Sequence, residues 1–264
     1  MKGSCTPRHR RTLGNVTRHG QGFTLVELLV AMAIALFLIG GLLTLVQDAK
    51  RTVGGQSQLV QLQDSERLAM TMITDVIQAA GYFPNPTAAT AATALPVVAG
   101  SFATAGQGIY GQSNFNAQGD SITARYQTAS GDGVINCTGT TNGTGAPLLY
   151  TNVFTVDAAG ELECQLTAGG VVAAAVPLVT GLATGQPSLQ IWYGVQTNGG
   201  NNGAVDSYIP AVNMTAANWM NVISVRVTLT FNNPLYVAGS GNGQPQTIAF
   251  TRVVGVMSKT GVQT

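Results

Sequence analysis

One unbroken apolar stretch near the start of the chain limits what this sequence can fold into. The stretch runs from Phe23 to Val46, and Glu27 is its only ionisable side chain. A helix of these 24 residues is roughly 36 Å long, which exceeds the about 30 Å hydrocarbon core of a bilayer. The sequence therefore predicts a membrane-spanning helix over residues 23–46.

A basic leader precedes this stretch. Residues 1–22 hold five bases and no acid, which leaves seven bases and eleven acids in the rest of the chain. Positive charge before a span holds that end in the cytoplasm, so we expect a single-pass protein whose remaining chain is exported. No small-residue cleavage site follows Val46, which favours a retained anchor over an ordinary secretory signal.

Glu27 requires an explanation, because a carboxylate at the centre of a bilayer costs about 2.5 to 3.5 kcal/mol on insertion scales. Two explanations remain open on these grounds. Glu27 could lie at the interface, where the helix N-terminus stabilises it, or it could pair with a cation.

Residues Gly22-Phe23-Thr24-Leu25-Val26-Glu27, after a basic leader, resemble the processing site of type IV prepilins and pseudopilins. The resemblance implies that prepilin peptidase cuts between Gly22 and Phe23 and that the new amine of Phe23 is methylated. It also implies that Glu27 pairs with the N-terminal amine of a neighbouring subunit during assembly. Residues 1–22 would then be a leader peptide that the mature chain lacks.

Beyond the apolar stretch, residues 47–83 continue as an amphipathic helix in which apolar residues recur at mostly helical spacing. Gly81, followed by Pro84 and Pro86, predicts its end. One helix is thus expected from Phe23 to Ala80. The pairs Gly40-Gly41 and Gly54-Gly55 are weak points, either tolerated or serving as a bend or local melting.

Residues 84–264 are expected to form an exported β-rich domain. Only 9% of the chain is charged, and Gly, Asn and Pro separate short β-branched runs. The predicted strands are Ile122 to Tyr126, Leu148 to Val156, Leu162 to Leu166, Val171 to Val176, Leu189 to Val195, Val222 to Phe231 and Thr247 to Val256. The predicted fold class is α+β, with the long N-terminal helix packed on an antiparallel sheet. The Ala- and Thr-rich segment from Thr87 to Thr104 is expected to be a loop or linker.

Later motifs narrow the resemblance to PilW-type minor pilins. They are Gln63-Asp64-Ser65-Glu66-Arg67, Ala79-Ala80-Gly81-Tyr82, Trp192-Tyr193-Gly194-Val195 and residues 219–227, WMNVISVRV. This resemblance implies a structural subunit of type IV pilus assembly, held in the bacterial inner membrane before assembly and in the periplasm or a surface pilus afterwards. The implied partners are other major and minor pilins, contacted through the N-terminal helix, prepilin peptidase and the pilus assembly machinery. The alternative within this architecture is a pseudopilin of type II secretion.

The cysteines and histidines argue against an enzyme. Cys5, His9 and His19 all lie in the leader, so the mature chain would keep Cys137 and Cys164 and no histidine. Two cysteines in an exported domain favour a disulfide over a two-cysteine metal site. Without histidine, Ser-His and Cys-His catalysis and the common zinc sites are excluded, and we expect no catalytic residue, metal or cofactor. Glu161 and Glu163 share one strand face, and a solvated strand explains them better than a glycosidase pair.

Three binding hypotheses concern the expected exported domain: a calcium site, a nucleic-acid site and a site for a surface ligand. In the segment 197–206, only Asp206 stands among neutral amides, which favours an Asn/Gly loop over a calcium site. Residues 84–264 hold four bases, too few for strong binding to nucleic acid. A membrane-anchored binding module is the alternative from a different class, and it would require Trp192, Trp219 or Tyr208 to be exposed and grouped on one face.

Overall fold

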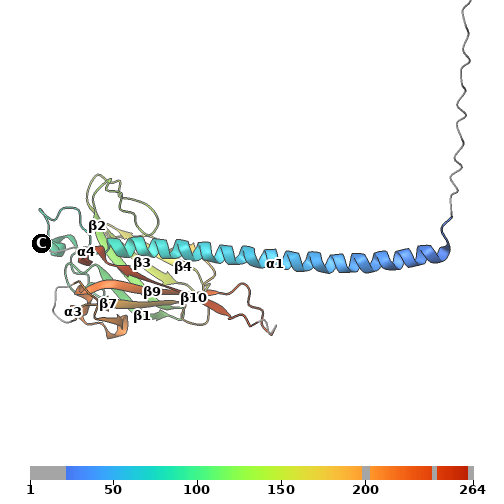
Figure 1. Cartoon of the computed structure of the whole chain (residues 1–264). Helices are drawn as coiled ribbons and strands as arrows, with labels where there is room; N and C mark the ends of the chain where they lie inside the picture. The colour runs from blue at the N-terminus through green and yellow to red at the C-terminus, as the bar shows by residue number, and fades with distance from the viewer. Residues whose placement is uncertain (1–21, 198–202, 240–242, 261–264) are drawn as a thin grey trace, which may run out of the picture. The chain divides into compact units, whose positions relative to one another are not determined.

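The computed structural model describes residues 22–197, 203–239 and 243–260, which form one long helix, a ten-stranded sheet and several short helices (Figure 1). The chain divides into two compact units, with the boundary between Val53 and Gly54. Each unit is described by itself.

The long helix α1 (Leu25–Ala79) contributes to both units. Its bounds confirm the helix predicted from Phe23 to Ala80 to within two residues at each end. The helix continues through Gly40-Gly41 and Gly54-Gly55, so neither pair melts it here. Gly81 ends it with φ +80°, a conformation that favours glycine, and the Gly81 N–H donates to the Arg125 carbonyl at 2.9 Å.

The second unit is built on a single sheet. Its strands are β1 (Ile109–Asn116), β2 (Gly119–Thr128), β3 (Leu148–Val156), β4 (Leu162–Ala168), β5 (Val171–Val172), β6 (Val176–Val179), β7 (Leu189–Val195), β8 (Ser207–Pro210), β9 (Val222–Asn232) and β10 (Thr247–Gly255). The order along the sheet is β10-β9-β7-β2-β3-β4-β5, with β1 on β2, β6 on β4 and β8 on β7. Pairing is antiparallel except where Gly119 of β2 meets Leu189 of β7. The short helices are α2 (Ala91–Ala94), the 3-10 helix η1 (Ala211–Asn213), α3 (Ala216–Met220) and α4 (Met257–Thr260).

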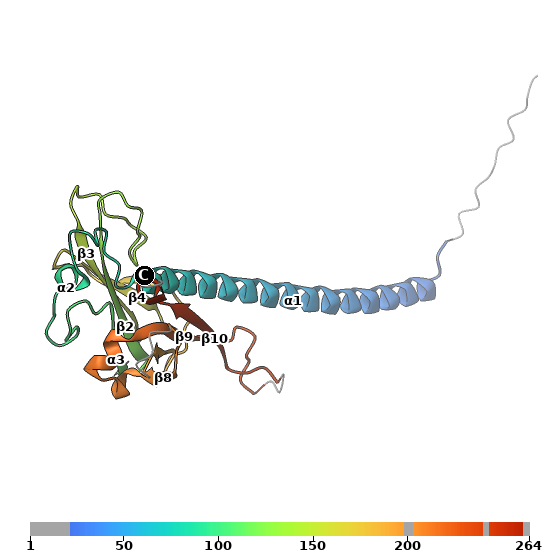
Figure 2. The same ribbon diagram turned by 60° about the vertical axis from the view of Figure 1, so that its left-hand side comes forward.

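The C-terminal part of α1 supplies one side of the core. Figures 1 and 2 show this part of the helix lying against the sheet. Met70, Ile73 and Ile77 are buried at helical spacing and share one hydrophobic cluster with alternate residues of the strands, among them Val225 and Val227 of β9. This packing gives the α+β fold expected from the sequence.

Three strands differ from the sequence prediction. β1 and β8 were not predicted, because β1 is largely polar and contains a glycine, and β8 has only four residues and ends in proline. The single strand predicted from Val171 to Val176 is wrong, since β5 and β6 are separate. Both pair with β4, where Val172 lies opposite Thr167 and Val176 opposite Cys164. The chain therefore advances four residues along β5 and β6 while β4 advances three, and the extra residue interrupts the ladder as in a β-bulge.

Candidate functional site

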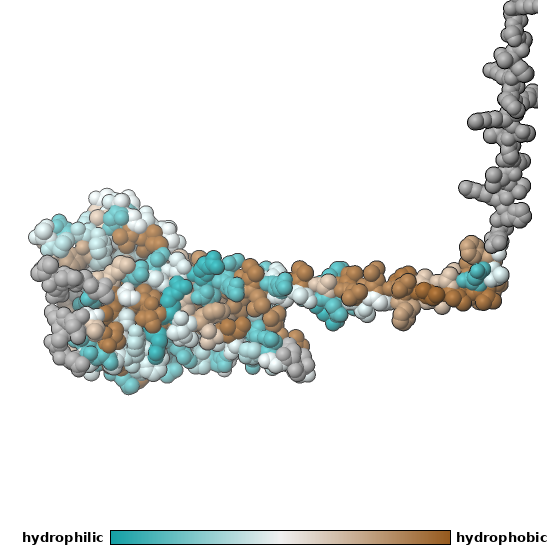
Figure 3. Space-filling view, viewed as in Figure 1, coloured by the Kyte–Doolittle hydropathy of each residue, from teal (hydrophilic) through white to brown (hydrophobic). Residues whose placement is uncertain are grey.

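The N-terminal part of α1 is apolar and exposed all round. Every residue from 22 to 50 is exposed, and among the large apolar side chains Phe23 is 86% and Phe37 84% exposed. Figure 3 shows these residues as a brown band along the helix. The helix is long and apolar enough to cross a membrane. Such a surface needs lipid or other apolar helices around it, because exposure of this much apolar area to water is unfavourable.

Glu27 lies in the first turn of this helix and forms a capping box with Thr24. The Thr24 backbone N–H and hydroxyl each donate to Glu27 Oε2 at 3.3 Å, and the Glu27 N–H donates to Thr24 Oγ1 at 3.3 Å. These contacts are long for hydrogen bonds, and the carboxylate remains exposed. Glu27 thus sits at the helix N-terminus with its oxygens accessible to a further donor.

The Gly22–Phe23 peptide bond immediately precedes the helix. Both residues are exposed and non-helical, and apart from the adjoining residues no described atom lies within 4 Å of the place where a Cβ on Gly22 would be. The described residues that follow Phe23 therefore do not cover the Gly22–Phe23 bond. The basic residues of the leader, with His9, His19 and Cys5, lie outside the described residues.

Cys137 and Cys164 form a disulfide, as predicted. Their Cα atoms are 6.1 Å apart, and both residues are fully buried in the hydrophobic cluster. The Cys137 N–H also donates to Asn152 Oδ1 at 2.9 Å. The bond ties the segment between β2 and β3 to β4.

Arg125 is an important residue that sequence reasoning treated only as one of four bases. It is fully buried on β2, and its three guanidinium nitrogens donate to the carbonyls of Gln107 (2.7 Å), Pro96 (2.5 Å) and Leu95 (3.2 Å). Its Cζ lies 3.9 Å from the centroid of the Phe102 ring. Burial lowers the pKa of Arg125 to about 10, so the group stays charged at neutral pH. The segment from Thr87 to Thr104, expected to be a loop, is therefore fastened to the sheet.

The aromatic residues proposed as a binding face divide into two groups. Trp219 is 9% exposed and packs against Tyr193 and Tyr110, with ring centroids 4.7 and 5.4 Å away. It belongs to the core. Trp192 and Tyr208 are only partly buried, and both contact Arg226.

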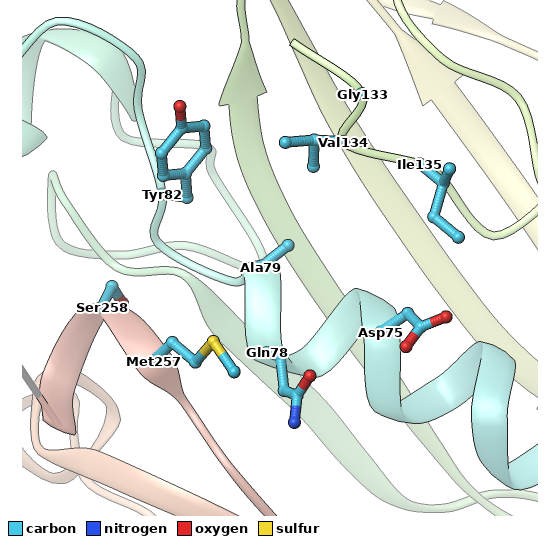
Figure 4. Close-up of a pocket in the computed structure, with 9 residues that line it drawn as sticks. All are labelled: Asp75, Gln78, Ala79, Tyr82, Gly133, Val134, Ile135, Met257 and Ser258. Atoms are coloured by element: carbon cyan, nitrogen blue, oxygen red, sulfur yellow. The ribbon is translucent and has the colours of Figure 1, made fainter.

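A pocket of about 460 Å³ lies at the C-terminal end of α1 (Figure 4). Side chains from the helix end, from the segment 133–135 and from α4 line it, and Asp75 is its only charged group. Ser258 on the same rim donates to the Ala80 carbonyl at 2.7 Å. One carboxylate among mostly apolar groups provides neither a metal ligand set nor an acid–base pair.

Glu161 and Glu163 flank the buried Leu162 on one side of β4 and are each half-buried. Among the residues that the structure describes, no three histidine, cysteine, aspartate or glutamate side chains group as they would around a metal. The loop 197–206 is described at its two ends only, where the Thr197 N–H donates to Asp206 Oδ2 at 2.7 Å, and residues 198–202 lie outside the described ranges.

An exposed apolar helix that continues into the core of an antiparallel domain is the architecture of a pilin-like protein. The sequence comparisons agree with this class. Residues 17–43 match the prokaryotic N-terminal methylation motif, and residues 140–259 match the type IV pilus-assembly protein W family. The two matches together fit a PilW-type pilin-like protein. A comparison with curated proteins and one with solved structures each gave no match.

Proposed function

We propose that the chain is a minor pilin-like structural subunit that takes part in type IV pilus assembly through α1. The observation that carries this proposal is the exposed apolar half of α1, which begins directly after Gly22-Phe23 and has one carboxylate, Glu27, in its first turn. The match of residues 140–259 to a pilus-assembly family supports a pilus over a type II secretion machine. The proposed role is structural and not enzymatic.

Processing by prepilin peptidase follows from the same proposal. Cleavage between Gly22 and Phe23 removes five bases, keeps the apolar helix and creates an ammonium group one helical turn from Glu27. Methylation of that amine is implied by the motif match. In the fibre, Glu27 pairs with the Phe23 amine of a neighbouring subunit, where low dielectric strengthens the attraction.

Localisation and domain organisation complete the proposal. The leader (1–22) faces the cytoplasm, residues 23–46 span the inner membrane, residues 47–83 continue the helix, and residues 84–264 form the exported domain. The disulfide supports an oxidising compartment for that domain. Other pilins, prepilin peptidase and the assembly machinery are its partners.

The N-terminus of the membrane form tests the proposal directly. The full chain is produced with and without prepilin peptidase, and its intact mass and first residue are determined. A mature protein that starts at methylated Phe23 only when the peptidase is present is the expected result. A chain that keeps residues 1–22, or that is cut after Val46, would contradict the pilin class.

A further inference from the structure

Two sequence motifs that lie about thirty residues apart meet on one face of the sheet. Val225 and Val227 of β9 belong to the core, so strand alternation places Arg226 on the opposite face. Trp192 of β7 is paired directly with Arg226 in the ladder. The guanidinium carbon of Arg226 lies 5.2 Å from the Trp192 ring centroid and 4.9 Å from that of Tyr208 on β8. We call Trp192, Tyr208 and Arg226 the arginine clamp.

Gly194 makes the clamp possible. A Cβ at this position would lie 3.0 Å from the Tyr208 ring and would collide with the Ser224 hydroxyl. Because Gly194 has no Cβ, the Tyr208 ring can lie over β7. The Tyr208 hydroxyl is then 3.1 Å from Ser224 Oγ. The motif Trp192-Tyr193-Gly194 therefore places one aromatic ring in the core and leaves room for another beside Arg226.

The N–H groups of Arg226 are not used within the described part of the chain. The Arg125 guanidinium donates from all three of its nitrogens, whereas the Arg226 guanidinium has no hydrogen bond and no ion pair among residues 22–197, 203–239 and 243–260. The two rings contact the guanidinium and restrict its side chain, which lowers the entropy lost when its N–H groups meet a partner. A carboxylate is the group that matches this fork, with two parallel hydrogen bonds.

The described ladder neighbours of the clamp on this face include neutral hydrogen-bonding groups. Gln190 and Thr228 are directly paired neighbours on the same face, and Thr228 Oγ1 lies 2.8 Å from Thr251 Oγ1 of β10. Arg252 faces the other way, because it is paired with the core residue Val227. Among the described residues of this face, Arg226 is thus a positive charge beside hydroxyls and an amide, which fits a ligand that carries a single carboxylate with several hydroxyls. The partly exposed indole of Trp192 suits the apolar face of a sugar ring.

We propose that the arginine clamp binds an acidic saccharide, with the sugar carboxylate held by Arg226. A strongly acidic peptide fits less well, since it would bring several carboxylates to a face with one cation. The proposal does not depend on the pilus role.

Binding to defined oligosaccharides tests the clamp. The full chain in detergent is titrated by calorimetry with galacturonic acid and 3′-sialyllactose, each of which carries one carboxylate, and with lactose as the neutral counterpart. We expect binding of at least one acidic sugar and little binding of lactose. Arg226→Gln should weaken that binding about tenfold or more, and Arg226→Lys, which keeps the charge without the planar fork, should weaken it less.

Arg252→Gln is the matched control, because it removes the same charge from the neighbouring strand on the opposite face. It should leave binding unchanged, and the thermal melts of all three variants should agree with that of the unaltered chain. Three results would each overturn the proposal: no acidic sugar binds, Arg252→Gln weakens binding as much as Arg226→Gln, or a tri-glutamate peptide binds more tightly than every acidic sugar.

Discussion

Arg125 is a buried cation that meets carbonyl groups instead of a carboxylate. Its three hydrogen bonds reach Leu95, Pro96 and Gln107, so one side chain on β2 positions a loop of more than ten residues. Burying a charge is unfavourable unless its hydrogen bonds are made, and here each guanidinium nitrogen has one.

Arg125→Met should therefore strongly destabilise the unit that contains the sheet. The substitution leaves three buried carbonyls without their donor, which we expect to cost about 3 kcal/mol or more and to lower the melting temperature by roughly 6 to 12 °C. Thermal unfolding of the full chain in detergent measures this. Arg252→Met, at an exposed position on β10, should change stability by no more than about 0.5 kcal/mol. Equal melting of the two variants would show that the hydrogen bonds of Arg125 add little.

Glu27 has a capping role in the structure and a pairing role in the proposed function, and two substitutions separate them. Glu27→Gln removes the charge, and we expect it to abolish or severely reduce incorporation into pili. Thr24→Ala removes the capping partner at a cost of about 1 kcal/mol to the helix end but keeps the carboxylate, so incorporation should persist. Immunoblots of sheared pili against whole cells give the measurement. Normal incorporation of Glu27→Gln would refute the pairing.

At the scale of single elements, the segment between β2 and β3 is held chiefly by side chains and one covalent bond. It has little regular structure, yet it contains the buried Asn136, Cys137 and Asn142. The disulfide joins it to β4 across 27 residues of sequence.

Removal of this disulfide should reduce stability without changing the fold class. The chain-entropy model gives a loss of about 3 to 4 kcal/mol for Cys137→Ser with Cys164→Ser, measured by chemical denaturation under oxidising conditions. Cys5→Ser serves as the control and should melt like the unaltered chain. If a reducing agent left the denaturation midpoint of the unaltered chain unchanged, this estimate would be wrong.

For the whole molecule, two buried tyrosines govern stability at high pH. Burial raises the pKa of Tyr126 and of Tyr193 above the ordinary value of about 10, and Tyr193 is fully buried with no hydrogen-bond partner for its hydroxyl among the described residues. Above pH 10 the unfolded chain releases these protons while the folded chain keeps them. Each tyrosine thus costs about 1.4 kcal/mol of stability per pH unit above pH 10.

Arg125 acts in the opposite direction. Its pKa is lowered to about 10 in the folded chain, so stability gains about 1.4 kcal/mol per unit as pH rises from 10 towards 12.5. Lys259, whose pKa burial also lowers, adds a gain only up to its ordinary value of 10.5. Above pH 10.5, two losses against one gain predict a net fall in stability. Tyr193→Phe should remove one loss, flatten the profile measured by thermal melts, and leave stability at pH 7 unchanged or raised. A profile as steep as that of the unaltered chain would contradict this assignment.

The parts of the fold that sequence could predict are those with a strong period. The helix from Phe23 to Ala80 and the strands at 148–156, 189–195 and 222–231 follow directly from apolar spacing. β1 could not be predicted because its residues are polar and it depends on pairing with β2. Arg125 resembles a solvated base in the sequence, and only the loop that covers it makes it a core residue. The arginine clamp could not be predicted either, because its three residues meet only through the register of β7, β8 and β9, which no local sequence pattern specifies.

The continuous helix α1 also has a mechanical consequence. Its backbone hydrogen bonds lie along its axis and join each turn to the next, so tension between the two ends of α1 would pass through the turns in series. The four glycines at 40–41 and 54–55 would extend first, since each stabilises the helix about 1 kcal/mol less than alanine would. A residue that passes from helix to extended chain lengthens by about 2 Å, so these glycines could together release roughly 8 Å. Under load, the chain would lengthen first at these two places in α1.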